Sequence, residues 1–584
     1  MTALADPLPR PEHPRPQLFR ESWLNLNGVW EFEVDSGRSG RERGRAKAPR
    51  LDGRIVVPFC PESSLSGIGN TDFIPAVWYR RSATIPPEWR GKRILLHVGA
   101  VDYESEVFVN GRSAGTHRGG STPVTLEITS LLQPGENSIA IYAEDDTRSP
   151  LQPTGKQSPR HGSYDCFYTR TTGIWQTVWL EAVAETYISK VRITPDLESG
   201  SVLVEATIDG PDLGVSLEAT ALAEGRIVGE ATCKRSGNRA TALVKLSTAR
   251  AWSPEDPFLY DLRLRLTRDG QALDEAASYF GLRTVRIDGL AITLNGKPVF
   301  QRLILDQGFY PDGIWTAPSD EALRHDIELS QAMGFNGARL HQKVFEPRFL
   351  YWADRLGYLV WGEFPSWGLD LARGEALDRF LREWVEELDR DYSHPAIVGW
   401  CPFNETNNRQ NPEVLRSAHR VTKAIDPTRP VIDTSGYVHV ETDIYDVHDY
   451  DQNPDTFAAR YQPLAEVGEA RRNFPRDDAP YRPGQPYFVS EYGGIWWNPG
   501  QRDSVGWGYG NRPRSEAEFV ERYRRLTEYL LQHPKMCAFC YTQLTDVEQE
   551  VNGLHTYHRV PKFDPSVIRA INSQPAAIER AAQR

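Results

Sequence analysis

Short runs of alternating hydrophobic and polar residues fill the first half of the chain, from about residue 24 to residue 282. Such runs include 77–85, 105–111 and 137–143, and the residue pairs Asn110-Gly111 and Pro134-Gly135 between strand-like segments favour tight turns. Alternation with a period of two places successive side chains on opposite faces of a β-strand, and many short strands between turns are typical of β-sandwiches. This half of the chain therefore predicts sheets without long helices.

The alternating region divides into two parts near residue 185. Residues 1 to about 20, which precede the first part, are proline-rich and polar and favour an extended arm. The second part covers about 100 residues, a length that fits an immunoglobulin-like sandwich. We therefore predict a β-sandwich domain over residues 1–185 and an immunoglobulin-like β-sandwich over residues 186–283.

From residue 284 onward, short apolar runs alternate with amphipathic stretches of helical period, such as 320–333. Alternation of β and α segments predicts a parallel sheet. Eight strands within about 290 residues match the count and size of a (β/α)8 barrel, so a third domain is predicted over residues 284–584. The strand candidates are residues 302–305, 337–340, 359–362, 397–404, 431–435, 445–448, 488–491 and 538–543.

Two of these apolar runs lead directly to a carboxylate. Residues 396–404 precede Glu405, and residues 487–490 precede Glu491. Both runs are short and rich in β-branched and aromatic residues, so they are expected to form buried parallel strands. Enzymes with α/β barrels keep their chemistry at the carboxyl ends of the strands. A single glutamate there is more often a salt-bridge or capping residue, but two in one barrel favour catalysis.

Paired carboxylates can cleave a glycosidic bond with retention of configuration. One carboxylate attacks the anomeric carbon while a second, ~5–5.5 Å away, protonates the departing oxygen. Two close carboxylates do not ionise together easily, so the one beside the other's charge is expected to keep its proton to higher pH. Asn404, next to Glu405, can donate a hydrogen bond to the neighbouring sugar hydroxyl.

Five short motifs in one order along the chain resemble glycoside hydrolase family 2. Members of this family include β-galactosidases, β-glucuronidases and β-mannosidases. The resemblance implies a jelly-roll domain, an immunoglobulin-like domain and a barrel, with Glu405 as the acid/base and Glu491 as the nucleophile. The motifs are Leu26-Asn27-Gly28-x-Trp30, Val109-Asn110-Gly111 with Gly115 and His117 following, Gly173-Ile174-Trp175, Asn404-Glu405, and Ser490-Glu491-Tyr492-Gly493.

The sequence departs from this family at two places that bear on the sugar. The family commonly has Arg-x-Ser-His-Tyr-Pro at the end of strand two, where residues 339–344 read Arg-Leu-His-Gln-Lys-Val. Its β-glucuronidases carry Asn-x-Lys after strand eight, whereas residues 550–555 contain no lysine. This absence disfavours a glucuronide. Lys343 could instead pair with a substrate carboxylate, although a lysine after a strand end is more often a solvated loop residue.

The resemblance therefore implies a retaining exo-β-glycosidase, with a β-galactosidase as the first expectation because that is the commonest activity of the family. The alternatives are a β-glucuronidase or β-galacturonidase, an arabinosidase, or a carbohydrate-binding protein that has lost catalysis. The intact Glu405 and Glu491 argue against the last of these.

Further candidates for substrate contacts are polar or aromatic residues near the carboxyl ends of the strands. Aromatic rings can stack on the apolar face of a sugar, and polar groups can bind its hydroxyls, although packing in the core is an equally good explanation for each ring. The candidates are Asp306, His341, His448, Tyr450, Trp496 and Tyr541.

Composition changes this picture little. The chain has 584 residues, 16 of them tryptophan, and a net charge of −12 with both signs interspersed, so neither nucleic acid nor a membrane surface is an expected partner. Six scattered cysteines predict free thiols in a reducing compartment. With no signal peptide or apolar run of ~20 residues, a cytoplasmic protein acting on carbohydrate is expected. We expect no metal and no cofactor, and a homo-oligomer stays open.

Overall fold

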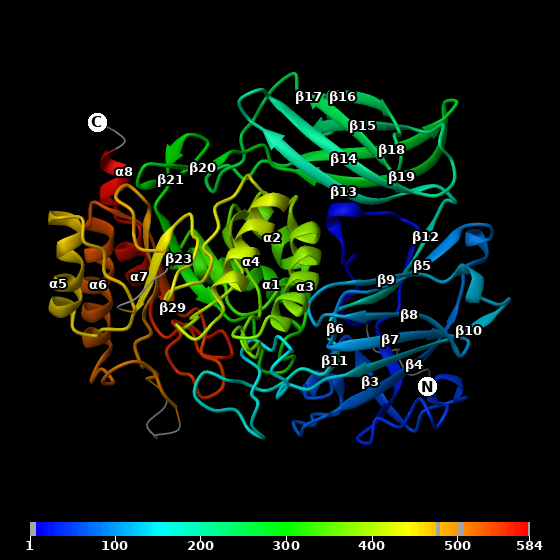
Figure 1. Cartoon of the computed structure of the whole chain (residues 1–584), viewed down its shortest axis with the longest axis horizontal. Helices are drawn as coiled ribbons and strands as arrows, with labels where there is room; N and C mark the ends of the chain where they lie inside the picture. Colours follow the sequence, from blue (N-terminus) through cyan, green and yellow to red (C-terminus); the bar gives the residue numbers. More distant parts are fainter. Residues whose placement is uncertain (1–7, 475–478, 500–505, 582–584) are drawn as a thin grey trace.

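The computed structural model describes residues 8–474, 479–499 and 506–581. Figure 1 shows an α/β barrel with two β-domains on one side of it, one built from the N-terminal residues and the other from the residues that follow. This architecture confirms the predicted fold class of a jelly-roll sandwich, an immunoglobulin-like sandwich and a (β/α)8 barrel.

The N-terminal domain is a sandwich of two antiparallel sheets. Its strands are β1 (Trp23–Asn25), β2 (Gly28–Val34), β3 (Gly53–Val57), β4 (Ala76–Thr84), β5 (Arg93–Val98), β6 (Val101–Asp102), β7 (Glu104–Val109), β8 (Arg112–Arg118), β9 (Val124–Glu127), β10 (Glu136–Glu144), β11 (Gly173–Ile174) and β12 (Val178–Val183). One sheet has the order β1-β12-β5-β9 and the other β3-β2-β4-β10-β7-β8, with β11 and β6 forming a small separate pair. Buried side chains such as Trp30, Val107 and Ile141 fill the space between them.

The second domain is a smaller sandwich, with sheets of order β13-β14-β17 and β16-β15-β18-β19. Its strands are β13 (Tyr187–Asp196), β14 (Ser201–Asp209), β15 (Ser216–Ala223), β16 (Arg226–Lys234), β17 (Arg239–Lys245), β18 (Tyr260–Arg268) and β19 (Gln271–Phe280). In β18, Leu262, Leu264 and Leu266 are buried while the residues between them are exposed. This period of two is the alternation that the sequence shows, and it sets which face of the strand packs in the core.

A short three-stranded sheet leads into the barrel, and seven parallel strands then form the barrel wall in the order β26-β25-β24-β23-β29-β28-β27. The short strands are β20 (Val285–Asp288), β21 (Ala291–Leu294) and β22 (Lys297–Pro298). The barrel strands are β23 (Gln301–Asp306), β24 (Gly337–Leu340), β25 (Leu359–Glu363), β26 (Ile397–Cys401), β27 (Tyr445–Asp449), β28 (Tyr487–Gly493) and β29 (Met536–Thr542). Each of these seven corresponds to a predicted strand.

The eighth predicted strand, residues 431–435, is the exception. It joins the fourth strand only through isolated parallel bridges at its two ends. The cause lies in Asp433, whose carboxylate accepts hydrogen bonds from the backbone nitrogens of Thr434, Val440 and Glu441 at 2.9, 2.6 and 2.9 Å. A side chain that binds nearby backbone groups competes with a regular strand ladder.

Helices cover the outside of the barrel (Figure 1). They are α1 (Asp320–Ala332), α2 (Pro347–Leu356), α3 (Glu375–Asp391), α4 (Pro412–Ile425), α5 (Pro454–Glu466), α6 (Glu516–Gln532), α7 (Pro565–Asn572) and α8 (Ala577–Ala581). Ser319, Asn411 and Ser515 cap the first turns of α1, α4 and α6 by accepting backbone hydrogen bonds. Among the described residues, no helix combines the length and the apolar character needed to cross a bilayer.

The N-terminal domain reaches the barrel through the loop between β10 and β11, residues 145–172. The backbone nitrogen of Thr154 donates to the carbonyl of Trp367 at 2.7 Å, and that of Asp370 donates to the carbonyl of Pro150 at 2.8 Å. This loop therefore lies against the segment that follows β25 at the carboxyl end of the barrel.

Candidate active site

Two glutamates and a histidine converge at the carboxyl ends of three barrel strands. Glu405 follows β26, His448 lies in β27 and Glu491 lies in β28. One side-chain oxygen or nitrogen of each residue lies within 4.8 Å of the others. The structure thus brings the two predicted catalytic carboxylates together at a separation that suits a retaining pair, well below the ~6.5–9.5 Å of an inverting pair.

The backbone around Glu405 is unusual. Its φ is 52°, in the left-handed region that non-glycine residues seldom occupy. The backbone nitrogen of Glu405 donates to the carbonyl of Ser435 at 2.9 Å, and this bond holds the residue at the end of the strand. Backbone conformations of this kind gather at functional sites, where the surrounding structure maintains them.

His448 connects the two carboxylates. Its Nδ1 lies 2.8 Å from Glu405 Oε1 and 3.5 Å from Glu491 Oε2. Burial opposes the imidazolium, but the charge of Glu491 and the hydrogen bond and charge of Glu405 raise the pKa of His448 above its ordinary value. Burial likewise favours the neutral carboxyls, but His448 together with Arg339 and other nearby basic groups lowers the pKa of both Glu405 and Glu491. From the sequence we expected repulsion between the two carboxylates to decide which of them keeps a proton. In the free protein this repulsion does not dominate, because the pKa of both carboxyls is lowered.

Arg339, in β24, lies under the pair and is 1% exposed. Its guanidinium donates to Glu491 Oε1 at 3.2 Å, to the backbone carbonyl of Ser490 at 2.7 Å, to Glu363 Oε1 at 2.6 Å and to Asn404 Oδ1 at 3.2 Å. Because the guanidinium is planar and rigid, these bonds fix Glu491 and Asn404 relative to each other.

The Asn404 amide is satisfied on one side only. Its oxygen accepts from Arg339, whereas its buried Nδ2 has no hydrogen-bond partner in the described part of the chain. Buried polar groups are normally paired, so a donor left free beside two carboxylates suits a ligand that brings its own acceptor. This is the arrangement expected for a donor to a sugar hydroxyl.

The chain matches family models along most of its length. The sugar binding domain of "Glycosyl hydrolases family 2" matches residues 68–158, the family's second model matches residues 186–283, and its TIM barrel domain matches residues 292–562. The chain belongs to glycosyl hydrolases family 2. It is a glycoside hydrolase, and an exo-β-glycosidase activity agrees with these matches and with its relatives.

Similar proteins include both glucuronidases and a galactosidase. The β-glucuronidase of Paenibacillus borealis is 26% identical over 450 residues, which are 72% of this chain and 74% of that protein. A β-galactosidase of Thermoanaerobacter pseudethanolicus is 27% identical over 367 residues, 60% of this chain and 48% of that protein. The solved structure of a Bifidobacterium dentium β-glucuronidase with coumarin-3-O-glucuronide has a TM-score of 0.79 at 20% identity and covers 94% of this chain and 97% of that one. This last likeness shows the fold.

In this family 2 enzyme, Tyr450 also contacts Glu491. Its hydroxyl donates to Glu491 Oε2, and its ring stacks on Tyr509 at a centroid distance of 3.5 Å. Burial, followed by the charge of Glu491, raises the pKa of Tyr450 well above its ordinary value. The hydroxyl therefore remains a neutral donor to the carboxylate.

His341 and Glu363 complete the layer below Glu491. His341 Nδ1 lies 3.2 Å from Glu363 Oε2 and 3.9 Å from Glu491 Oε1. Burial lowers the pKa of His341 well below its ordinary value and raises that of Glu363 to about 7. Glu363 was not among the predicted residues, although it ends the apolar run of β25 much as Glu491 follows an apolar run in β28.

Asp306 and Lys343 lie deeper than expected. Asp306 ends β23 and accepts a hydrogen bond from the backbone of Gly308 at 2.9 Å, while burial raises its pKa to about 7. The Lys343 ammonium donates to the carbonyls of Gly308 and Trp315 at 2.6 and 2.7 Å, and burial lowers its pKa to about 7. Lys343 is therefore no solvated loop residue, and its ammonium points to protein carbonyls.

The two predicted aromatic contacts differ in exposure. Trp496 is half-buried in the loop after β28, with the guanidinium of Arg512 5.8 Å from its ring centroid. Tyr541 is fully buried, and its ring packs against Tyr492 and Tyr523 at 5.5 and 4.9 Å. Tyr541 thus offers no open face to a sugar, and this geometry agrees with the core-packing alternative.

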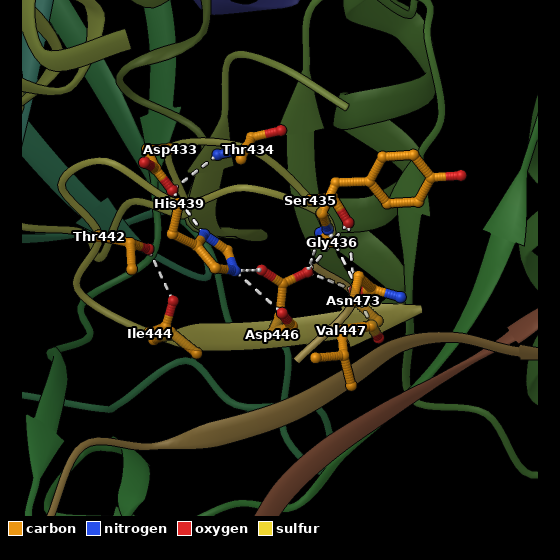
Figure 2. A network of polar contacts seen from close by, with 12 residues as sticks. Asp433, Thr434, Ser435, Gly436, His439, Thr442, Ile444, Asp446, Val447 and Asn473 are labelled. Carbon is orange, nitrogen blue, oxygen red and sulfur yellow. Dashed lines mark hydrogen bonds and ion pairs between the residues drawn. The ribbon is translucent and has the colours of Figure 1, made fainter. Parts of the chain in front are cut away.

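A polar network reaches His448 through Ser435, and Figure 2 shows the part of this network around His439 and Asp446. Ser435 Oγ lies 2.9 Å from His448 Nε2 and donates to Asp446 Oδ2 at 3.1 Å. In Figure 2 the His439 ring lies between Asp433 and Asp446, with Nδ1 2.8 Å from Asp433 Oδ1 and Nε2 3.3 Å from Asp446 Oδ1. Burial opposes the charge on His439, but the two carboxylates raise its pKa to about 10. This imidazolium ties the segment after residue 431 to β27.

Glu405, His448 and Glu491 are also the one group in the described part of the chain whose ligand atoms converge as in a metal site. An ion there would have to replace the hydrogen bond between His448 and Glu405. The sequence predicted no metal, and this stays a prediction.

Proposed function

We propose that this enzyme hydrolyses terminal β-D-glucuronides with retention of configuration. The observation that carries the retaining mechanism is the approach of Glu405 and Glu491 to within 4.8 Å at the ends of two barrel strands. The preference for glucuronide is supported by the β-glucuronidases among the relatives of this chain, such as that of Paenibacillus borealis.

The proposed reaction proceeds through a covalent intermediate. The Glu491 carboxylate attacks the anomeric carbon while Glu405 gives its proton to the departing oxygen, so that an ester forms as the glycosidic bond breaks. Glu405 then removes a proton from water, the water oxygen attacks the anomeric carbon, and the ester breaks. Arg339 and Tyr450 orient the nucleophile through their hydrogen bonds to its two oxygens.

The proton for the first step is held between His448 and Glu405, whose atoms lie 2.8 Å apart. In the free enzyme, the raised pKa of His448 and the lowered pKa of Glu405 favour the proton on the imidazole. When Glu491 becomes an ester, its negative charge no longer stabilises the imidazolium. The pair can therefore pass the proton back and forth between the two half-reactions.

A β-galactoside is the second candidate substrate. The Thermoanaerobacter pseudethanolicus relative and the missing Asn-x-Lys motif after strand eight favour it. The two candidates differ in charge at the sugar's sixth carbon, which makes them easy to separate by assay.

The test is hydrolysis of matched 4-nitrophenyl glycosides of β-D-glucuronic acid, β-D-galacturonic acid, β-D-galactose and α-L-arabinose. We expect the largest kcat/KM on the glucuronide. A larger value on the galactoside would replace the proposal with the second candidate, and no release from any substrate would return the protein to a carbohydrate-binding role. A 2-fluoro glycoside of the preferred sugar should label Glu491, and labelling elsewhere would contradict the assigned mechanism.

A further inference from the structure

The loop formed by residues 145–172 of the N-terminal domain is fixed tightly on the barrel. The backbone nitrogen of Gly155 donates to the carbonyls of Pro365 and Trp367 at 3.2 and 3.1 Å. Gly155 has a φ of +56°, and a Cβ there would lie 2.3 Å from the carbonyl oxygen of Gln342. Only glycine fits this close approach, and the contact fixes the backbone position of the next residue.

That next residue is Lys156, which is 6% exposed. Its ammonium lies 4.1 Å from the ring centroid of Trp367, and the indole nitrogen of Trp367 donates to the backbone carbonyl of Asn404 at 3.2 Å. Lys156 is therefore separated from the backbone that carries Glu405 by a single indole ring. A lysine from the first domain reaches the site whose carboxylates come from the third.

Three lysines are buried in the described part of the chain, and they differ in what they bind. Lys343 donates to two carbonyls, and Lys562 pairs with Asp546 at 2.6 Å. Lys156 forms no salt bridge with any described residue, and the thiol of Cys166 is the polar side chain beside it. A buried ammonium without an anion is costly, so this site is built to receive one.

The electrostatic surroundings keep Lys156 charged. Burial opposes the ammonium, but Cys166 and the carboxylates of Glu550, Glu405 and Glu491 raise the pKa of Lys156 above its ordinary value. The same carboxylates would repel an anionic sugar. A free cation would offset that repulsion, but the guanidinium of Arg339 is already engaged with protein oxygens, and His448 is held between Glu405 and Glu491.

We propose that Lys156 binds the carboxylate of the terminal uronic acid and so sets the preference for uronides over neutral sugars. This inference rests on the proposed function. In this chain, a lysine of the N-terminal domain would provide the positive charge that the Asn-x-Lys motif, absent from residues 550–555, would otherwise supply. An ammonium held over an indole ring is partly desolvated, which strengthens its hydrogen bond to a carboxylate.

The test compares Lys156→Met with wild type on 4-nitrophenyl β-D-glucuronide and β-D-glucoside, which differ only at the sixth carbon. Methionine keeps most of the side-chain volume and removes the charge. We expect kcat/KM on the glucuronide to fall by at least about 30-fold, the smallest loss typical of removing one partner of a buried charge pair. On the glucoside we expect less than about a threefold change, and Lys156→Arg should retain part of the glucuronide activity.

Binding provides a second readout that does not depend on turnover. D-Glucuronate should raise the Tm of wild type and leave that of Lys156→Met unchanged, whereas Lys190→Met, an exposed lysine on β13, should respond as wild type does. Equal losses on both glycosides, or an unchanged glucuronide rate, would overturn the role of Lys156 alone. Wild type that prefers the galactoside and ignores glucuronate would overturn the proposed function itself.

Discussion

At the scale of single residues, the proposed role of Glu405 is to donate one proton to the departing oxygen. Replacing Glu405 with alanine removes the proposed general acid, so glycosides with poor leaving groups should lose about 10²- to 10⁴-fold in kcat/KM. Activated phenols need little protonation and should lose far less. The measurement is a series of aryl glycosides of graded leaving-group pKa, with azide added to restore the second step. Equal losses across the series would mean that Glu405 only positions the substrate.

His448 should control the alkaline side of the pH profile. Its pKa is raised above the ordinary 6.5, so the pair with Glu405 keeps its proton, and its activity, to higher pH. In His448→Gln the proton must reside on Glu405 alone; burial then raises the pKa of this carboxyl from its ordinary 4.5, but the imidazole, whose own pKa lies above 6.5, is gone. We therefore expect the alkaline limb of kcat/KM to move to lower pH. The pH profile of the exposed His161→Gln variant serves as the control, and an unmoved limb in His448→Gln would contradict a shared proton.

The sequence identified residues by their position after a strand, and this worked where the side chain points into the barrel mouth. Glu405, Glu491, Asn404 and His448 all meet there. Position alone does not tell which way a side chain points, because neighbours on a strand alternate between the two faces. Tyr541 was predicted as a sugar contact for this reason, whereas its ring is buried and packs against Tyr523 of α6.

At the level of whole elements, apolar runs bounded by turns located seven barrel strands. Residues 431–435 read as an eighth strand because they are mostly apolar or β-branched, but the Asp433 carboxylate takes the place of a ladder partner. No local pattern reveals that a carboxylate will fold back onto its own backbone. The buried ion pairs of His439 with Asp433 and Asp446 hold the same segment, and their contribution to the stability of the protein can be measured.

Replacing His439 with glutamine should destabilise the protein by about 3–5 kcal/mol, because it leaves Asp433 and Asp446 buried without their cation. Since the pKa of His439 is raised from 6.5 to about 10, its stabilising contribution is complete below pH 6.5 and is lost as the pH rises toward 10. The free energies of unfolding of wild type and His439→Gln, measured with denaturant at several pH values, should therefore approach each other as the pH rises toward 10. The matched variant His161→Gln changes an exposed ion pair and should cost less than about 1 kcal/mol. A difference that is constant with pH would rule out a charged His439.

At the scale of the whole molecule, we expect the active site to depend on the contact between the loop of residues 145–172 and the barrel. Gly155→Ala places a methyl group against the carbonyl of Gln342 and should displace the loop from the barrel. A misplacement of about 1 Å can cost about 10²-fold in rate, and we expect a loss of this order in kcat/KM on the preferred substrate. Gly162→Ala, in the same loop with open space at its Cβ, is the control. Similar activity of the two variants would show that docking of the loop is not required.

Contacts between domains are the part of the site that could not be predicted from the sequence. Three domains could be separated by the period of their hydrophobic pattern, which is a local property. Lys156 lies in a loop without any such pattern, about 250 residues before Glu405, and nothing in its neighbourhood marks it as part of a barrel site. Contacts between domains are set by the shapes of folded surfaces, so they become visible only in three dimensions.

The loop of residues 145–172 has a consequence for how such enzymes diversify. The carboxylates proposed to break the bond belong to one domain, and the lysine near them belongs to another. Mutations in the first domain can therefore alter which sugars are accepted while the bond-breaking residues remain untouched. Recombination that exchanges N-terminal domains between related genes would transfer a substrate preference as a unit, and the inherited chemistry would continue to operate on a new set of natural glycosides.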